Sequence, residues 1–246
     1  MTLALDGRVA LVTGSSSGIG AAVARRLALA GVHVVVNSRS SVEEGQAVAA
    51  EIGGSYLQAD VADPDAARAL VAAVVAAHGR LDIVVNNAGT TQVIAHADLE
   101  AATPEVWMRI YATNVVAPFV LTTAAVPTLR AAPDGGVVVN IGSLAGLRPT
   151  GSSIPYAASK AALHHQTRLV AAAVGPEVRV NAVAPGLVDT PWTADWTEIH
   201  AAVKAGTPMR RVATPDDVAD VVMAQITSPL ITGEVWTVDS GMGLVR

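Results

Sequence analysis

Short runs rich in Val, Ile and Leu alternate with longer Ala-rich segments of helical periodicity along the whole sequence. The short runs predict seven strands, at residues 8–13, 33–37, 55–59, 81–86, 136–141, 178–183 and 234–238. The longer segments predict helices at about residues 18–30, 41–52, 64–78, 103–130, 157–174 and 214–227. Because strands that alternate with helices pair in parallel and are covered on both faces, the pattern predicts an α/β fold with a doubly wound, seven-stranded parallel sheet.

No linker, repeat or low-complexity segment interrupts this alternation, so residues 1–246 are predicted to form a single domain.

The net charge of −5 and the absence of any Lys/Arg cluster argue against nucleic acid or an anionic membrane as a partner. A chain without cysteine has no disulfide framework and no thiolate nucleophile. No apolar run approaches the roughly 18 residues of a membrane span, and no signal peptide is recognisable, so we expect a cytoplasmic protein.

A glycine-rich turn, "TGSSSGIG" (13–20), follows the first predicted strand. Gly14, Gly18 and Gly20 would let the backbone turn tightly and approach a pyrophosphate, and the next helix would offer free N–H groups to the anion. In doubly wound sheets, ligands bind beyond the carboxyl ends of the strands. The turn therefore predicts a Rossmann-type dinucleotide site, although a turn of this kind also occurs without a ligand.

The segment "YAASK" (156–160) contains one of only two lysines in the chain. In a helix, Tyr156 and Lys160 would be i,i+4 neighbours on one face. A nearby ammonium favours the phenolate and would lower the tyrosine pKa from its usual value near 10. Taken alone, the two residues would equally suit a solvated pair on a helix surface.

Together these segments resemble the short-chain dehydrogenase/reductase family, classical type. The resemblance covers essentially the whole chain, and its motifs occur in the family's order and at about its spacing. They are "TGSSSGIG" (13–20), "DV" (60–61), "NNAG" (86–89), Asn114, Ser143, "YAASK" (156–160), "PG" (185–186) with Thr190, and "ITGEVWTVDSG" (231–241). Each motif alone is common, whereas the ordered set is specific.

The resemblance implies a role for each of four catalytic residues. Tyr156 would be the general acid for carbonyl reduction and the base for alcohol oxidation. Lys160 would hold the nicotinamide ribose and tune the tyrosine, and Ser143 would bind the substrate oxygen. Asn114 would steady the active-site helix and help to pass protons to solvent through water. Without their context, Ser143 would suit a turn and Asn114 a helix cap or a satisfied core amide.

The resemblance also implies a cofactor site made of the glycine turn, the ends of several strands and the active-site pair. Its residues are Gly14, Ser16, Ser17, Gly18, Ile19, Gly20, Ser38, Arg39, Asp60, Val61, Asn87, Ala88, Gly89, Tyr156, Lys160, Pro185, Gly186, Val188 and Thr190. In this set, Asp60 and Val61 would flank the adenine ring, although Asp60 would also suit a turn.

The end of the second strand bears on the choice of cofactor. NAD-binding folds usually place a carboxylate there to accept from the adenosine ribose hydroxyls, and this chain has Ser38 followed by Arg39. A guanidinium binds a 2′-phosphate bidentately, whereas a carboxylate would repel it. We therefore predict NADP(H) over NAD(H), with Ser38 assisting Arg39. NADP users of the family often carry a second arginine at the position of Ser17, and its absence here weakens the preference. Arg39 would also suit an ordinary surface position.

The substrate is expected against Ser143, Tyr156, Leu144, Trp192 and Trp196. The loops that would frame it are residues 90–102, 144–155 and 187–212. The last of these also contains Met209, and we expect it to form an apolar lid that excludes water and favours a hydrophobic ketone or secondary alcohol. Its tryptophans would equally suit packing against the body of the protein or a neighbouring subunit.

These observations predict an NADP(H)-dependent oxidoreductase, a carbonyl reductase or alcohol dehydrogenase that transfers a hydride between cofactor and substrate. One alternative is a 3-oxoacyl-[acyl-carrier-protein] reductase-like enzyme. That activity would need a basic docking patch, and the turns at 131–136 and 171–177 contain no Lys or Arg. Another alternative is a non-catalytic, nucleotide-binding regulatory relative, but such proteins usually lack the tyrosine, lysine or serine that this chain retains.

The family resemblance also implies a homo-oligomer, a tetramer or a dimer, with the helices that contain Tyr156 and Asn114 at one interface and the C-terminal segment at another. The six histidines form no recognisable cluster, so no metal is predicted. His164 and His165 are adjacent and would face different directions on the active-site helix, which favours packing or subunit contact for both.

Overall fold

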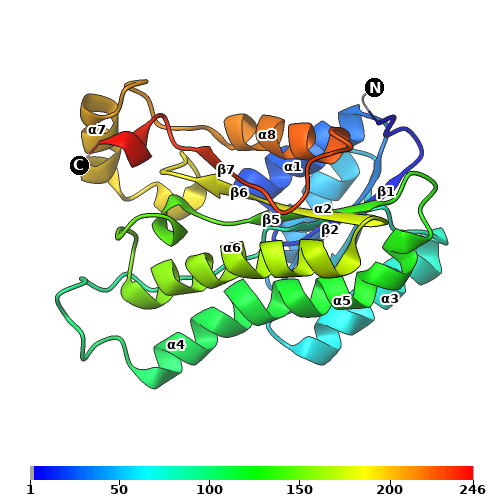
Figure 1. Ribbon diagram of the computed structural model, residues 1–246, viewed down its shortest axis with the longest axis horizontal. Coiled ribbons are helices and arrows are strands. Elements are labelled where there is room, and N and C mark those ends of the chain that lie inside the picture. Colours follow the sequence, from blue (N-terminus) through cyan, green and yellow to red (C-terminus); the bar gives the residue numbers. More distant parts are fainter. Residues whose placement is uncertain (1–2, 246) are drawn as a thin grey trace.

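A single seven-stranded sheet forms the centre of the computed structural model, which describes residues 3–245 (Figure 1). The strands are β1 Val9–Val12, β2 His33–Ser38, β3 Ser55–Gln58, β4 Ile83–Asn86, β5 Gly136–Ile141, β6 Val178–Pro185 and β7 Val235–Val238. All neighbouring strands pair in parallel, in the order β3-β2-β1-β4-β5-β6-β7. The predicted doubly wound α/β fold is confirmed; residues 1, 2 and 246 of the predicted domain lie outside the described residues.

Helices cover both faces of the sheet, and they pack there because alternate residues of each strand point to opposite sides. The α-helices are α1 Gly18–Leu29, α2 Val42–Glu51, α3 Pro64–His78, α4 Pro104–Tyr111, α5 Ala117–Arg130, α6 Ile154–Val174, α7 Thr197–Gly206 and α8 Pro215–Thr227. From β1, Ala10 and Val12 pack with α1, α2 and α8. Val9 and Leu11 pack on the other face with α3, α5 and α6. Burial on both faces explains why the strands are continuous apolar runs.

Two helical segments differ from the sequence prediction in ways that affect the site. The predicted helix 103–130 contains a π-helical turn, η1 Ala112–Val116, between α4 and α5. Helix α6 begins at Ile154 and not at residue 157, because Ser153 caps it by accepting from the Tyr156 N–H and Pro155 suits the first turn. Tyr156 therefore lies inside the helix, one turn before Lys160.

The predicted lid region is partly helical. It contains the short 3₁₀ turn η3 Pro191–Thr193 and helix α7, which the sequence analysis did not predict. Two further 3₁₀ turns, η2 Leu144–Gly146 and η4 Met242–Leu244, lie after β5 and near the C-terminus.

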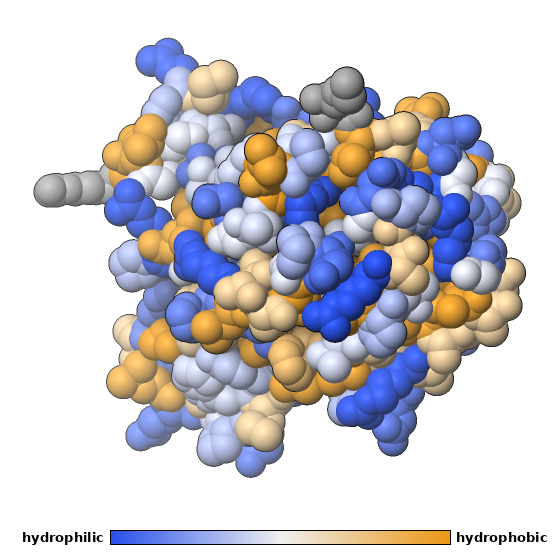
Figure 2. All heavy atoms as spheres, turned by 45° about the vertical axis from the view of Figure 1, so that its right-hand side comes forward, coloured by the Kyte–Doolittle hydropathy of each residue, from blue (hydrophilic) through white to orange (hydrophobic). Residues whose placement is uncertain are grey.

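One helical stretch, Pro104–Arg130, is long and apolar enough to cross a membrane by length and composition alone. In the fold it contributes Leu121, Ala125 and Leu129 to the core between the sheet and its helices, as core helices of α/β domains do. Apolar and polar side chains are interspersed over the face of the molecule that Figure 2 shows, which is usual for a water-exposed protein surface.

Gly20 sets how closely α1 can approach the end of the sheet. A Cβ at this position would lie 2.5 Å from the Gly14 carbonyl oxygen and 2.5 Å from Asn87 Nδ2. We expect Gly20→Ala to lower the free energy of unfolding by about 1–3 kcal/mol, because the extra carbon overpacks this contact. Gly206→Ala is the matched control, since its added Cβ meets nothing within 4 Å beyond its chain neighbours and the adjacent backbone of its own helix.

Urea unfolding of the two variants measures the difference. Equal midpoints for Gly20→Ala and Gly206→Ala would show that α1 is not packed tightly through Gly20.

Candidate active site

A cavity of about 1060 Å³ lies beyond the carboxyl ends of the strands. It includes the gap between β1 and β4, where the strand order reverses and α/β sheets bind their ligands. All of the predicted cofactor and substrate residues line it except Gly20, which lies beneath the turn. Of the four predicted catalytic residues, Ser143, Tyr156 and Lys160 line the cavity, whereas Asn114 does not.

The glycine turn is held open by contacts with the end of β4. Gly14 and Gly18 have left-handed backbones, with φ of 61° and 54°, which favours glycine at both positions. Asn87 Nδ2 donates to the Thr13 and Gly14 carbonyls at 2.9 and 2.8 Å, and Thr13 Oγ1 accepts from the Ala88 N–H at 3.1 Å. Helix α1 then begins at Gly18, so its first N–H groups face the cavity. These residues fit the pyrophosphate of a dinucleotide.

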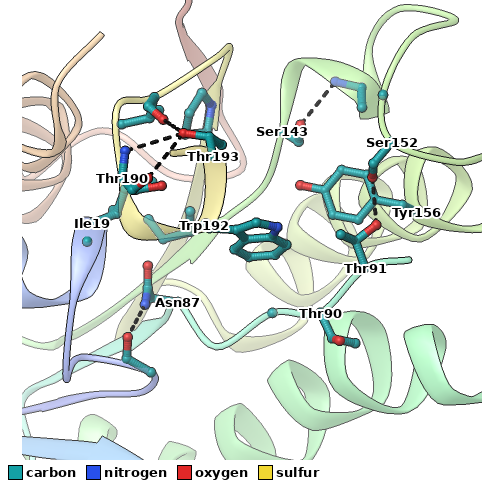
Figure 3. A pocket seen from close by; sticks show the side chains of 18 of the residues that line it. Ile19, Asn87, Thr90, Thr91, Ser143, Ser152, Tyr156, Thr190, Trp192 and Thr193 are labelled. Carbon is teal, nitrogen blue, oxygen red and sulfur yellow. Dashed lines mark hydrogen bonds between the residues drawn. The ribbon is translucent and has the colours of Figure 1, made fainter. Parts of the chain in front are cut away.

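Ser143, Tyr156 and Lys160 meet at the other end of the cavity. Figure 3 shows the hydroxyl groups of Ser143 and Tyr156 facing the same space, and the Ser143 side chain acts to lower the pKa of the Tyr156 phenol. Lys160 is buried; its Nζ donates to the Ile141 carbonyl at 2.8 Å and lies 5.8 Å from the centroid of the Tyr156 ring. Tyr156 and Lys160 are therefore not a solvent-exposed pair on the helix surface.

The pKa of Tyr156 differs from the sequence-based expectation. Burial raises the pKa of the phenol, and the hydrogen bond from Ser143 opposes this rise. The prediction that Lys160 lowers the pKa of Tyr156 is wrong for this structure, because the ammonium is directed at the Ile141 carbonyl. Burial also lowers the pKa of Lys160 itself, to about 8.

Asn114 lies within the π-helical turn η1 and is fully buried. Its Oδ1 accepts from the Thr90 N–H at 2.9 Å, and its Nδ2 donates to the Thr90 carbonyl and to Ser159 Oγ, each at 3.0 Å. Asn114 thus links the loop after β4 to α6, which agrees with a steadying role. Its part in a water-mediated proton path stays a prediction.

The adenosine end of the cavity is formed after β2 and β3. Ser38 is buried, and its hydroxyl donates to the Ser41 carbonyl and pairs with the Tyr56 hydroxyl, both at 2.8 Å. These bonds occupy the hydroxyl that we expected to assist a phosphate. Arg39 is exposed, and within residues 3–245 it forms no salt bridge. Asp60 Oδ1 accepts from the Ala62 N–H at 3.0 Å, the turn role weighed for it above.

The lid residues divide into two groups. Trp192 projects into the cavity (Figure 3), and its ring centroid lies 6.5 Å from that of Tyr156 with an interplanar angle of 71°. Trp196 lines the cavity but also packs against the apolar cluster of Leu187, Val203 and Val212. Met209 is 64% exposed and lies outside the cavity, so its predicted place in an apolar lid over the site is wrong.

Sequence reasoning identified the loops around the substrate end but not their polar side chains. Thr91 Oγ1 and Ser152 Oγ form a 2.6 Å hydrogen bond beside Tyr156 (Figure 3). Both residues lie in loops predicted to frame the pocket, but no motif distinguishes them from other loop hydroxyls. Among residues 3–245, no group of three or more His, Cys, Asp or Glu side chains could hold a metal ion.

Comparisons with known proteins agree with this geometry. The family model described as "Enoyl-(Acyl carrier protein) reductase" matches residues 14–243. The "Granaticin polyketide synthase putative ketoacyl reductase 2" of Streptomyces violaceoruber is 52% identical over 248 residues, which cover 99% of each chain. The human "Dehydrogenase/reductase SDR family member 4" is 37% identical over 249 residues, covering 96% of this chain and 88% of the relative.

Solved structures lead to the same family. A short-chain dehydrogenase/reductase of Serratia marcescens, solved as a double mutant, superimposes with a TM-score of 0.89 at 34% identity, over 98% of this chain and 100% of the other. The chain is therefore a member of the short-chain dehydrogenase/reductase family, classical type. It belongs to an oxidoreductase family whose members use NAD(P).

The lowered pKa of Lys160 predicts a pH dependence. Because that pKa is about 8 and not 10.5, the ammonium charge is lost as the pH rises through about 8. We expect kcat/KM for turnover with the reduced nicotinamide to fall over this range, since the profile reports groups of the free enzyme. Lys160→Arg keeps a cation at every accessible pH and should move the fall to higher pH. Identical profiles for wild type and Lys160→Arg would assign the titration to another group.

Proposed function

We propose that the protein is an NADP(H)-dependent carbonyl reductase that interconverts a ketone and a secondary alcohol. The observation that carries this proposal is the meeting of the Ser143 and Tyr156 hydroxyls at one end of a cavity whose other end is the glycine turn. The nicotinamide, when bound, supplies the hydride for reduction or accepts it in oxidation. The side chains of the protein bind the substrate oxygen and move its proton.

Two hydroxyl groups can donate to a substrate carbonyl oxygen placed between Ser143 and Tyr156. Because burial raises the pKa of Tyr156, its phenol keeps its proton near neutral pH and can act as the acid when the carbonyl is reduced. The O–H bond of Tyr156 breaks as the alcohol O–H forms, which leaves a phenolate. The Ser143 side chain, which opposes the rise in the pKa of Tyr156, then stabilises that phenolate. Alcohol oxidation follows the same path in reverse.

A ketoacyl substrate is the second candidate, supported by the printed name of the relative that is 52% identical. The turns at 131–136 and 171–177, which contain no Lys or Arg, do not bear on docking of an acidic carrier protein. They precede the amino ends of β5 and β6, at the edge of the sheet opposite the cavity, and their carboxylates Asp134 and Glu177 pair with Arg8 and Arg130. The aromatic Trp192 inside the cavity favours an apolar ketone.

The proposal of NADP(H) rests on Arg39. It lines the cavity after β2, is exposed, and stands where a carboxylate would otherwise prefer a free ribose. An arginine of this kind can bind a 2′-phosphate through two parallel hydrogen bonds. The hydroxyl of Ser38 already bonds to the Ser41 carbonyl and to the Tyr56 hydroxyl. A substitution of Arg39 therefore tests cofactor choice more directly than a substitution of Ser38.

We also propose that the protein forms a homo-oligomer through α4, α5 and α6. The outer surfaces of these helices and of η1 carry the exposed apolar side chains Met108, Val116, Phe119 and Leu169. Burying them against a second copy would remove apolar area from water. Sedimentation velocity of the purified chain measures the oligomeric state.

The first prediction of this proposal concerns the transferable proton. Tyr156→Phe should keep nucleotide binding but lower kcat by about 10²–10⁴-fold, because the ring still packs while the acid is gone. Absorbance of the reduced nicotinamide, followed with a panel of ketones and secondary alcohols, measures the rate. Tyr111→Phe, which removes a hydroxyl that does not line the cavity, is the control and should keep wild-type turnover. A Tyr156→Phe rate within threefold of wild type would remove Tyr156 from its role.

The second prediction concerns cofactor choice. Arg39→Ala should raise the KM for NADPH by about 10- to 150-fold and leave NADH nearly unchanged, because a charge-assisted hydrogen bond to phosphate contributes roughly 1.5–3 kcal/mol. Arg68→Ala removes an exposed arginine outside the cavity and is the control. A wild-type enzyme that prefers NADH, or an Arg39→Ala variant that weakens both cofactors equally, would contradict the assignment.

A further inference from the structure

His164 is a buried histidine behind the catalytic serine. It lies on α6, one turn after Lys160 and two turns after Tyr156, and is 2% exposed. Its Nε2 accepts a hydrogen bond from the backbone N–H of Ser143 at 3.4 Å. The adjacent His165 is exposed, so the two histidines have different environments. The sequence analysis favoured packing or subunit contact for both.

The imidazole of His164 lies against the backbone on both sides of Ser143. A Cβ added to Gly142 would overlap Nε2 of the ring, and one added to Gly146 would lie 2.8 Å from its Cε1. Glycine is therefore needed at both positions for the ring to approach this closely. The backbone of residues 142–146, which includes Ser143, thus packs directly against the imidazole ring of His164.

The protonation state of His164 follows from these contacts. Because Nε2 accepts from an N–H, the ring proton of the neutral imidazole is on Nδ1. Burial, together with the charges of Lys160 and Arg168, lowers the pKa of His164 to about 4, and the Gly146 backbone partly opposes this effect. His164 is therefore neutral near pH 7 and can accept from Ser143.

Packing alone does not account for a histidine at this position. Within residues 3–245, Nδ1 of His164 is buried and has no hydrogen-bond partner. A buried polar atom without a partner is unfavourable, and an apolar side chain of similar volume would avoid it. A role that uses Nε2 as an acceptor explains why a histidine occupies this site.

We propose that His164 is a positioning residue for the carbonyl chemistry, which it serves by holding the Ser143 backbone so that the serine hydroxyl faces Tyr156. This inference rests on the proposed function, in which Ser143 contacts the substrate oxygen. Helix α6 then fixes the end of β5 at three successive turns. Tyr156 meets the Ser143 hydroxyl, Lys160 holds the Ile141 carbonyl, and His164 holds the Ser143 N–H.

The position of Ser143 Oγ depends on its backbone because that hydroxyl oxygen also accepts from the Ala145 N–H at 3.2 Å. A shift of the backbone at residue 143 therefore moves the oxygen relative to Tyr156. Misplacement by about 1 Å in an active site can lower the rate on the order of 10²-fold.

Three variants test the proposal. His164→Leu removes the acceptor but keeps an apolar side chain of similar size, whereas His164→Gln offers an amide oxygen near the position of Nε2. His165→Leu is the matched control on the exposed neighbour. We expect His164→Leu to lower kcat by about 10- to 100-fold with the KM for NADPH within twofold, His164→Gln to recover at least a third of wild-type kcat, and His165→Leu to match wild type.

A purely structural role predicts the opposite order, because a buried leucine is tolerated better than a buried glutamine. A His164→Leu variant with kcat within threefold of wild type, or one as active as His164→Gln, would overturn the proposal. Thermal unfolding of each variant shows whether a loss of kcat exceeds any loss of folded protein.

A second measurement requires no substrate. Long-range ¹H–¹⁵N spectra of the wild-type protein at pH 7, with the His164 signals assigned from the His164→Gln spectrum, report the tautomer. We expect the neutral ring protonated at Nδ1. A ring protonated at Nε2, or an imidazolium, would overturn the proposal. A wild-type enzyme with this tautomer that reduces no carbonyl would instead contradict the proposed function and leave the hydrogen bond to Ser143 intact.

Discussion

The hydrogen bond from Lys160 Nζ to the Ile141 carbonyl joins the active-site helix to the end of the central strand β5. The rest of the site depends on this contact, because it brings the α6 face that carries Tyr156 against the segment that carries Ser143. Its cost is visible in the pKa of Lys160, which burial lowers to about 8. A buried amine is unfavourable for folding, so its retention here is better explained by chemistry than by stability.

Buried polar contacts continue from this junction into the sheet. Asn86 at the end of β4 donates to Asn140 Oδ1 at 2.8 Å, and Asn140 donates to Thr167 Oγ1 of α6 at 2.9 Å. Asn114 makes a second link, from the loop after β4 to Ser159 of α6. These networks hold β4, β5 and α6 in one arrangement, since breaking any bond leaves a buried polar group unpaired. The Tyr156 hydroxyl therefore stands on one of these held elements, and Ser143 follows the end of another by two residues, as accurate positioning requires.

The sequence was sufficient for the sheet and for most of the cavity lining, because strands buried on both faces are apolar throughout and their carboxyl ends meet at one edge. It was insufficient where the outcome depends on tertiary packing. Helix α7 lies in a segment predicted as a loop, and the π-helical turn at Asn114 interrupts a periodicity that looked continuous. The sequence did not predict that the pKa of Tyr156 is raised, because that direction follows from how deeply the phenol is buried. The sequence analysis assigned His164 to packing or subunit contact, because the burial that distinguishes it from the exposed His165 depends on tertiary packing.

The two ends of the cavity differ in the burial and hydrogen bonding of their side chains. This difference determines which residues can be substituted without loss of the fold. At the adenosine end, Arg39 is exposed and forms no salt bridge within residues 3–245, so we expect a substitution there to alter the affinity for a phosphate with little effect on packing. At the catalytic end, Lys160, His164 and Asn114 are each at most 4% exposed and hydrogen-bonded to neighbouring backbone. A change in any of them disturbs several contacts at once. Cofactor preference is therefore expected to vary more readily than the acid–base chemistry, which is tied to the packing of α6 on β5.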